Sequence, residues 1–246
     1  MTLKSQTISN KLIDEFCACL ASKKTPSEFE VARFKREANK LKAIDPSTAA
    51  ALHGIIACLD GNLDECKKQH EHAIRLDSSF INYSRYFASL FNLGRYQDAY
   101  DWLNKGLLKY PDSPELLTEA ITTSYFLGLY DKVVEHSKTL EKLRMLELES
   151  KTMNYLSQAI FMLQMKITVE TWHQLSLIME DVRLKHGVRI EEVSLIKSED
   201  GLFKWIETNA DVDTTVNMNL ELCEKMAEAN DFDLGNVAVA FRVCQN

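Results

Sequence analysis

The hydrophobic residues recur every three or four positions over most of the chain, which is the spacing that predicts amphipathic helices. A first helix is predicted at residues 8–22, and a second is predicted to begin at Thr25. Thr25 is followed by Pro26 and Glu28, which together supply an N-cap, a proline at the first helical position and a capping-box glutamate. From Thr48 onward, helical segments alternate with short polar or glycine-containing turns. The pattern predicts a mainly α fold.

Three of these turns carry a glycine at a nearly constant spacing, namely Gly61, Gly94 and Gly128. A large side chain follows two residues later in each turn, and a smaller side chain lies three residues beyond it: Leu63 and Cys66, Tyr96 and Ala99, Tyr130 and Val133. A period of about 34 residues is typical of stacked helical hairpins. Each glycine would end the first helix of a hairpin, where a positive φ is needed.

The best-preserved unit, residues 80–113, resembles the tetratricopeptide repeat. Its matching positions are Tyr83 in the tryptophan slot, Leu90, Gly94, Tyr96, Ala99, Leu103 in the aromatic slot, Gly106 and Pro111. The resemblance covers roughly residues 15–147 and is weaker at both edges. It implies a stack of antiparallel helical hairpins in which the first helix of each hairpin lines a concave groove.

That groove implies a partner-binding surface. The positions carried over from the family are Ile55, Leu59, Ser84, Ala88, Phe91, Asn92, Thr118, Thr122, Tyr125 and Phe126. Family members that clamp a C-terminal carboxylate use Lys and Asn at fixed positions, where this chain has Ala51 and Ile55. An apolar or amphipathic segment of a partner is therefore the expected ligand. The alternative is that Phe91, Tyr125 and Phe126 pack against a neighbouring helix of the same chain.

Beyond Glu147 the period ends and the pattern changes. We expect a helical repeat domain with a capping helix at residues 1–167, and a small α+β domain of order α-β-β-α-β at residues 168–246. Two strands are predicted around the turn Glu199–Asp200–Gly201, and the alternation after Asn236 predicts a third strand. The helix after Asp213 has one apolar face, formed by Val216, Leu220, Cys223 and Met226. The predicted sheet is short and antiparallel.

Composition narrows the possible functions. The net charge of −7 argues against a nucleic-acid partner, because phosphate binding depends on Lys and Arg. No run of about 18 apolar residues occurs, so neither a membrane span nor a membrane partner is expected. The six cysteines are scattered without a Cys-x-x-Cys pair, which favours a reducing, cytoplasmic setting.

Candidate chemistry is sparse. Cys66 and His70 have a spacing that can hold zinc on a helix, but both fall in core positions of the repeat, so packing is the preferred interpretation. No catalytic residue, metal or cofactor is predicted. The sequence therefore predicts a non-catalytic protein–protein interaction module, such as an adaptor, scaffold or chaperone-like protein, with a homodimer through the C-terminal part as a further hypothesis. The alternatives are a peptide-sensing regulator and an enzyme with a site around Trp172, His173 and Trp205.

Overall fold

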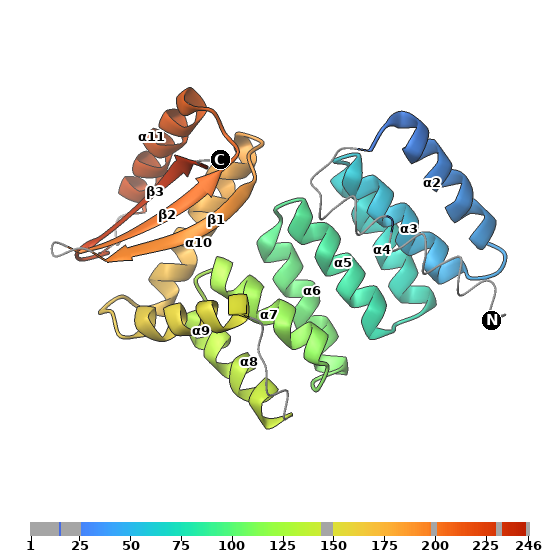
Figure 1. The fold of residues 1–246 in the computed structure, drawn as a ribbon, viewed down its shortest axis with the longest axis horizontal. Helices are drawn as coiled ribbons and strands as arrows, with labels where there is room; N and C mark the ends of the chain where they lie inside the picture. Colours follow the sequence, from blue (N-terminus) through green and yellow to red (C-terminus); the bar gives the residue numbers. More distant parts are fainter. Residues whose placement is uncertain (1–14, 16–25, 144–149, 198–200, 230–232, 245–246) are drawn as a thin grey trace. The chain divides into compact units, whose positions relative to one another are not determined.

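The computed structural model describes residue 15 and residues 26–143, 150–197, 201–229 and 233–244. This part of the chain is mainly helical and ends in a small three-stranded sheet, which confirms the predicted fold class (Figure 1). The predicted helix at residues 8–22 lies outside the described residues except for Glu15. Contacts divide the chain into two compact units, Met1–Leu116 and Leu117–Asn246.

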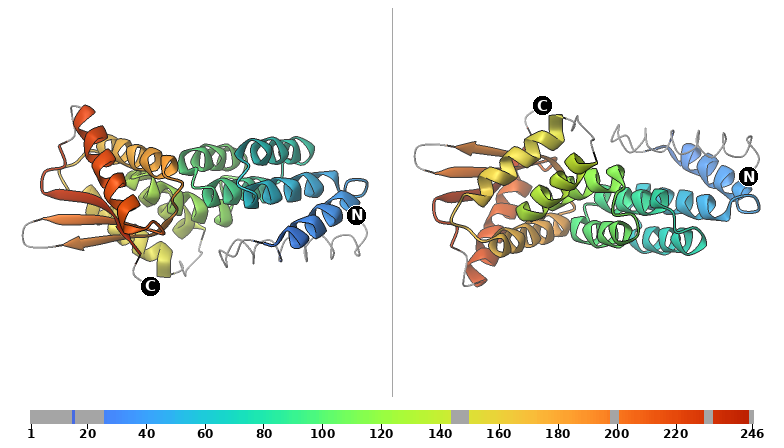
Figure 2. Two further views of the ribbon diagram at one scale, coloured as in Figure 1. Left: turned by 90° about the horizontal axis from the view of Figure 1, so that it is seen from above. Right: turned by 90° about the horizontal axis from the view of Figure 1, so that it is seen from below.

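In residues 26–116 of the first unit, helix α2 is followed by two helical hairpins. These helices are α2 (Glu28–Leu41), α3 (Pro46–Leu59), α4 (Leu63–Leu76), α5 (Phe80–Asn92) and α6 (Tyr96–Lys109). Helices α3 and α4 form one antiparallel pair and α5 and α6 form the other (Figures 1 and 2). The two hairpins stack because α5 contacts both α3 and α4, while α2 packs against α3.

The turns inside the hairpins share one backbone geometry. Gly61, Gly94 and Gly128 have φ angles of 70°, 69° and 70°, the left-handed region that glycine enters at low cost. The residue after each glycine donates its N–H to the carbonyl five residues earlier: Asn62 to Ala57 at 2.8 Å, Arg95 to Leu90 at 2.9 Å, and Leu129 to Ser124 at 2.9 Å. These bonds satisfy carbonyls at the helix end. The predicted recurrence of the turn is therefore confirmed.

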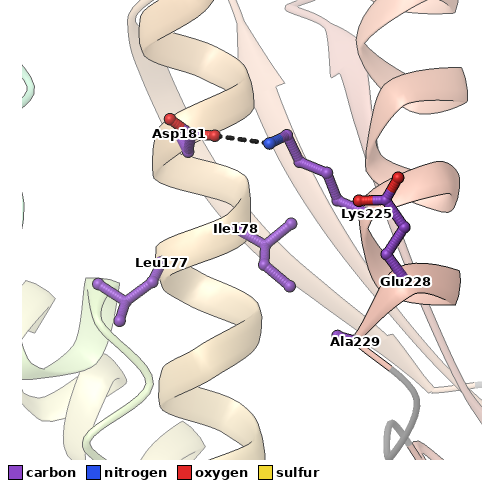
Figure 3. Close-up of a pocket in the computed structure, with 6 residues that line it drawn as sticks. All are labelled: Leu177, Ile178, Asp181, Lys225, Glu228 and Ala229. Atoms are coloured by element: carbon purple, nitrogen blue, oxygen red, sulfur yellow. Dashed lines mark ion pairs between the residues drawn. The ribbon is translucent and has the colours of Figure 1, made fainter.

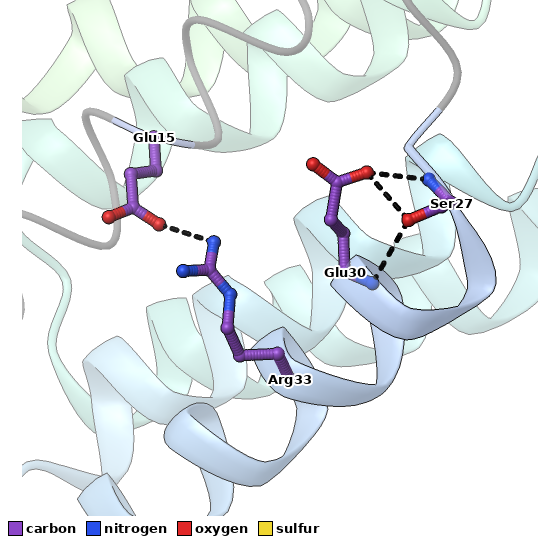
Figure 4. Close-up of polar contacts among 4 residues, drawn as sticks. All are labelled: Glu15, Ser27, Glu30 and Arg33. Atoms are coloured by element: carbon purple, nitrogen blue, oxygen red, sulfur yellow. Dashed lines mark hydrogen bonds and ion pairs between the residues drawn. The ribbon is translucent and has the colours of Figure 1, made fainter.

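Helix α2 begins with a capping box that lies two residues later than the one predicted from Thr25 and Glu28. Ser27 Oγ accepts a hydrogen bond from the Glu30 N–H at 3.3 Å, and the Ser27 N–H donates to the Glu30 carboxylate at 2.8 Å (Figure 4). Two overlapping Ser/Thr-x-x-Glu patterns are present here, and the one starting at Ser27 forms. The predicted cap, Thr25, lies outside the described residues.

The second unit contains a third hairpin and the C-terminal sheet. Its elements are α7 (Pro114–Phe126), which begins just before the boundary, α8 (Tyr130–Lys142), α9 (Ser150–Leu163), α10 (Val169–Lys185), β1 (Ile190–Lys197), β2 (Leu202–Thr208), α11 (Val212–Glu228) and β3 (Val237–Val243). Helix α9 packs against α8, and α10 packs against α11. The order α-β-β-α-β from α10 onward agrees with the prediction.

The sheet has the order β1-β2-β3 and is mixed. The antiparallel pairing of β1 with β2 was expected, and Ser194 lies opposite Trp205. Strand β3 instead pairs parallel to β2, so the prediction of an antiparallel sheet is wrong for this strand. The physical reason is the intervening helix: α11 returns the chain to the same end of the sheet, and a strand that follows such a crossover runs parallel.

The two faces of the sheet differ in burial. On β2, Leu202, Lys204 and Ile206 are buried, whereas Phe203 and Trp205 point to the opposite, partly exposed face. The buried face contacts the helices, since α11 packs against β3 and Lys204 reaches an aromatic ring of α10. The core of the second unit therefore lies between the sheet and its helices.

The face of helix α11 that packs against this core differs from the apolar face predicted from the sequence. Thr215, Met218 and Leu222 are buried. Of the predicted apolar face, Met226 is half-buried, while Val216, Leu220 and Cys223 are exposed.

The expected domain boundary between residues 167 and 168 does not coincide with the division of contacts at Leu116. The reason is that α10 is bound to the third hairpin. The Trp172 ring of α10 packs edge-on against the Tyr130 ring of α8 at 5.7 Å, and a Cβ on Gly128 would lie 2.5 Å from the Trp172 carbonyl oxygen. The third hairpin therefore belongs with the α+β part.

Candidate functional site

Helix α5 has one continuous partly exposed face. Its buried residues are Asn82, Tyr83, Tyr86, Phe87, Ser89 and Leu90. The remaining positions from the second residue onward form the α5 face, which consists of Ile81, Ser84, Arg85, Ala88, Phe91 and Asn92. At 100° per residue these six positions fall within one third of the helix circumference. All four α5 residues that the resemblance assigned to the groove belong to this face.

The aromatic member of the α5 face is held in place by its neighbours. The Phe91 ring lies 5.5 Å from the Phe87 ring and 4.8 Å from the Tyr96 ring, with the second pair edge-to-face. At the end of the same face, Asn92 Nδ2 donates to the Ala88 carbonyl at 2.7 Å. Phe91 is therefore a positioned ring with one partly exposed side.

The groove positions on α3 are covered by another helix of the chain. Ile55 is 4% exposed and belongs to the core that α3 shares with Phe34 of α2, and the partly buried Leu59 packs against the same core. The expectation that Ile55 lines an open groove is wrong, because α2 occupies that side of α3. Sequence periodicity places Ile55 on a helix face but does not specify which neighbour covers that face.

The groove positions on α7 are also partly covered. Tyr125 is 1% exposed, stacks on Tyr155 of α9 at 4.4 Å, and donates a hydrogen bond to Gln158. Phe126 packs edge-on against the same Tyr155 ring at 6.2 Å. For Tyr125 the structure therefore favours the alternative, packing against a neighbouring helix, which here is α9. Thr118, Thr122 and Phe126 are half-buried.

Cys66 and His70 are both fully buried in the hairpin core, as the packing interpretation predicted. The His70 ring stacks on Tyr86 at 5.0 Å, and its Nε2 lies 2.8 Å from Ser89 Oγ. A Cβ on Gly54 would lie 2.5 Å from the ring, so glycine at this position lets α3 approach α4 closely. The histidine ring therefore fills the space between three helices.

Burial also determines the protonation states of these two groups. Burial lowers the pKa of His70 to about 3 and raises the pKa of the Cys66 thiol to about 12. At neutral pH His70 is a neutral ring and Cys66 is a thiol. A thiolate is the form of cysteine that binds metals and reacts with electrophiles. Because Cys66 is a thiol at neutral pH, the pair behaves as buried core residues.

The three residues of the hypothetical enzyme site do not converge. Trp172 is 1% exposed on the helix-facing side of the sheet, and His173 Nδ1 lies 3.0 Å from the Leu127 carbonyl. Trp205 points to the other face of the sheet, where it stacks on Phe203 at 6.1 Å. Successive residues of a strand point to opposite faces, so only Lys204, and not Trp205, can reach Trp172.

Lys204 is the titratable residue that sequence reasoning missed. Its ammonium is 3.1 Å from Tyr130 Oη and lies over the rings of Trp172 and Tyr130 at 5.6 and 5.8 Å. Burial lowers the pKa of Lys204 to about 8. The available signal was its position between the apolar Leu202 and Ile206, which places it on the buried face of a strand.

An open hollow of about 420 Å³ lies between α10 and α11. It is lined by Leu177, Ile178 and Asp181 from α10 and by Lys225, Glu228 and Ala229 from α11 (Figure 3). An ion pair of 2.8 Å between Asp181 and Lys225 spans its rim. The two charged side chains pair with each other and link α10 to α11. We therefore interpret them as structural residues and not as a binding site.

Within the described ranges, no group of three or more His, Cys, Asp or Glu side chains is placed to hold a metal ion. Of the helices in that part of the chain, none is both long and apolar enough to cross a membrane. Comparison with protein-family models, curated proteins and solved structures gives no match. The repeat resemblance and the exposure of the side chains both point to the α5 face as the candidate site.

Proposed function

We propose that the chain is a non-catalytic protein–protein interaction module that binds a segment of a partner protein on the α5 face. One observation carries the proposal: the four α5 positions expected from the tetratricopeptide resemblance, Ser84, Ala88, Phe91 and Asn92, all lie on the partly exposed side of the helix. An adaptor, scaffold or chaperone-like role fits such a surface. The residues at equivalent positions on α3 and α7 contribute less, because α2 and α9 cover two of them.

The chemistry of the α5 face defines the ligand. Ile81, Ala88 and Phe91 supply apolar contact, and Phe91 is already positioned by its neighbouring rings. A rigid aromatic side chain with one exposed side is the type of residue that dominates binding energy at interfaces. The polar members of the face, Ser84, Arg85 and Asn92, supply hydrogen-bonding groups around this apolar centre. We expect an apolar or amphipathic peptide segment as ligand.

The test uses a displayed peptide library selected on the wild-type chain, followed by affinity measurement of the selected peptides on variants. Ala88→Glu places a charged side chain in the middle of the α5 face, and we expect it to weaken binding by roughly tenfold or more. Leu108→Glu is the matched control, because Leu108 is 87% exposed on α6 and outside this face. It introduces the same side chain and should leave affinity unchanged.

Two results would contradict the proposal. One is a selection that enriches no peptide above background. The other is a set of peptides that bind Ala88→Glu as tightly as the wild type. Circular dichroism of both variants separates loss of the surface from loss of the fold.

A further inference from the structure

The exposed face of α11 carries a continuous apolar stripe. Val212, Val216 and Leu220 are 67%, 52% and 59% exposed, and they are followed by the exposed Cys223 and Ala227. These five residues, the α11 stripe, are spaced four, four, three and four positions apart. At 100° per residue they fall within less than a quarter of the helix circumference.

The α11 stripe is not the side that anchors the helix. A different side of α11 packs through Thr215, Met218 and Leu222. In addition, the side chain of Asn219 bonds to both backbone groups of Phe241, which ties α11 to β3. The packing of α11 on the sheet therefore does not involve the stripe. The stripe is a second apolar face, in addition to the face that packs against the core. A spacing of three and four is also the spacing with which one helix packs along another.

The charges beside the α11 stripe are acidic. Asp213 and Glu224 are exposed and lie on the same flank, next to Val216 and Leu220 on the helix surface. The helix carries a single basic residue, Lys225, and its ammonium is directed to Asp181 of α10 at 2.8 Å. Glu221 is already bound to Lys185 at 2.9 Å and to His186 at 3.1 Å. The charge available to a ligand along this flank is therefore negative.

We propose that the α11 stripe binds an amphipathic helix of another protein, with apolar residues at the same three-and-four spacing and Lys or Arg along one flank. Apolar contact along the stripe supplies the association, and the acidic flank selects the basic partner. A second copy of this chain fits less well, because pairing two α11 helices brings two acidic flanks together. This inference concerns a surface separate from the α5 face and does not depend on it.

The test uses the full chain and a fluorescent amphipathic peptide of Leu, Ala and Lys, with Leu at the three-and-four spacing and Lys on one flank. A second peptide with Glu in place of Lys has the same apolar face and reversed charge. We expect the basic peptide to bind and the acidic peptide to bind at least about tenfold more weakly. Binding of the basic peptide should weaken as salt concentration rises.

Three variants assign the binding to the stripe. Leu220→Glu should weaken binding of the basic peptide by about tenfold or more, whereas Leu108→Glu, at an exposed leucine of α6, should leave binding unchanged. Glu224→Lys should weaken binding of the basic peptide and reduce its preference over the acidic one. All three substitutions are at exposed positions, so circular dichroism and thermal unfolding should match the wild type.

Cys223 gives a direct readout from within the stripe. Bound peptide should slow its alkylation, measured by mass spectrometry of the peptides after digestion, while Cys244, which follows β3 and is not part of the stripe, serves as the internal reference. Equal binding to wild type and Leu220→Glu, or unchanged alkylation of Cys223, would overturn the proposal. So would a concentration-dependent dimer that Leu220→Glu abolishes, since that result would assign the stripe to a second copy. Binding of the chain to anionic vesicles through the stripe would overturn it in favour of a membrane surface.

Discussion

The ammonium group of Lys204 lies 3.1 Å from the hydroxyl of Tyr130, and both side chains are buried. Two aromatic rings face the charge, Trp172 at 5.6 Å and Tyr130 at 5.8 Å. In the described part of the chain, no carboxylate forms an ion pair with Lys204. Burial lowers the pKa of the lysine to about 8, and burial raises the pKa of Tyr130, so its hydroxyl remains a neutral acceptor. A lysine held this way makes the stability of the second unit depend on pH.

We expect Lys204→Met to flatten the dependence of unfolding free energy on pH between about 8 and 10.5. The unfolded chain keeps the lysine proton up to its ordinary pKa of 10.5, while the folded chain releases it near 8. Stability of the wild type therefore rises with pH across this window, by about 3 kcal/mol in total, because each unit of pKa shift corresponds to about 1.4 kcal/mol. Urea unfolding at several pH values measures the slope. The same slope in wild type and variant would show that Lys204 does not titrate in this window.

Tyr130→Phe should destabilise the protein at pH 7 by about 1–3 kcal/mol, because the buried ammonium loses its hydrogen-bond acceptor. The loss should shrink at pH 10, where Lys204 is neutral in the folded chain. Combining Tyr130→Phe with Lys204→Met should cost less than the sum of the two single changes, since the double variant leaves neither group unsatisfied. Strict additivity would show that the two side chains are energetically independent.

The hairpin turns could be predicted because their geometry is local. Gly61, Gly94 and Gly128 each occupy a position that needs a positive φ, and the helix ends there whatever surrounds it. The pairing of β1 with β2 was predictable for the same reason, because two strands joined by a short turn pair antiparallel.

The outcomes that the sequence did not predict all depend on distant parts of the chain. Periodicity identified one apolar arc on α11, around Leu220, but a second arc around Met218 meets the core instead. Tyr125 and Ile55 lie at the expected helix positions, and they are buried because α9 and α2 happen to cover them. Which neighbour covers a face is a property of tertiary packing, which no local spacing encodes. On α5, the buried residues lie on the other side of the helix, so the positions expected from the local spacing stay partly exposed in the described structure.

Gly54→Ala should destabilise the first unit by about 1–3 kcal/mol, although alanine is the better helix former. The added Cβ would lie 2.5 Å from the His70 ring, which is fixed by stacking on Tyr86. Thermal or urea unfolding measures the change. A second substitution, His70→Ala, removes the obstacle, so Gly54→Ala should be neutral or stabilising in that background. Destabilisation of equal size in both backgrounds would contradict the steric explanation.

His70→Phe should reduce the loss of stability on acidification between pH 6.5 and 4. Burial lowers the pKa of His70 to about 3 in the folded chain, whereas the unfolded chain takes up the proton near 6.5. Stability therefore falls as pH drops below 6.5, by up to about 3 kcal/mol at pH 4 from this group. Phenylalanine keeps a flat ring against Tyr86 and cannot be protonated. Unfolding curves at pH 4 and pH 7 provide the comparison, and an unchanged difference between them would exclude His70 as the source.

Asn219→Ala should loosen the outer edge of β3. The Asn219 side chain accepts a hydrogen bond from the Phe241 N–H at 2.8 Å and donates one to the Phe241 carbonyl at 2.9 Å, so it occupies the edge that another strand would otherwise pair with. Removing both bonds should cost about 1–3 kcal/mol and speed hydrogen exchange at the Phe241 amide. An uncovered edge also promotes association between chains, which light scattering would detect. Asn217→Ala is the matched control, because Asn217 is exposed on the same helix and the change in helix propensity is identical. If both variants exchange and associate alike, the Asn219 side chain does not protect the edge.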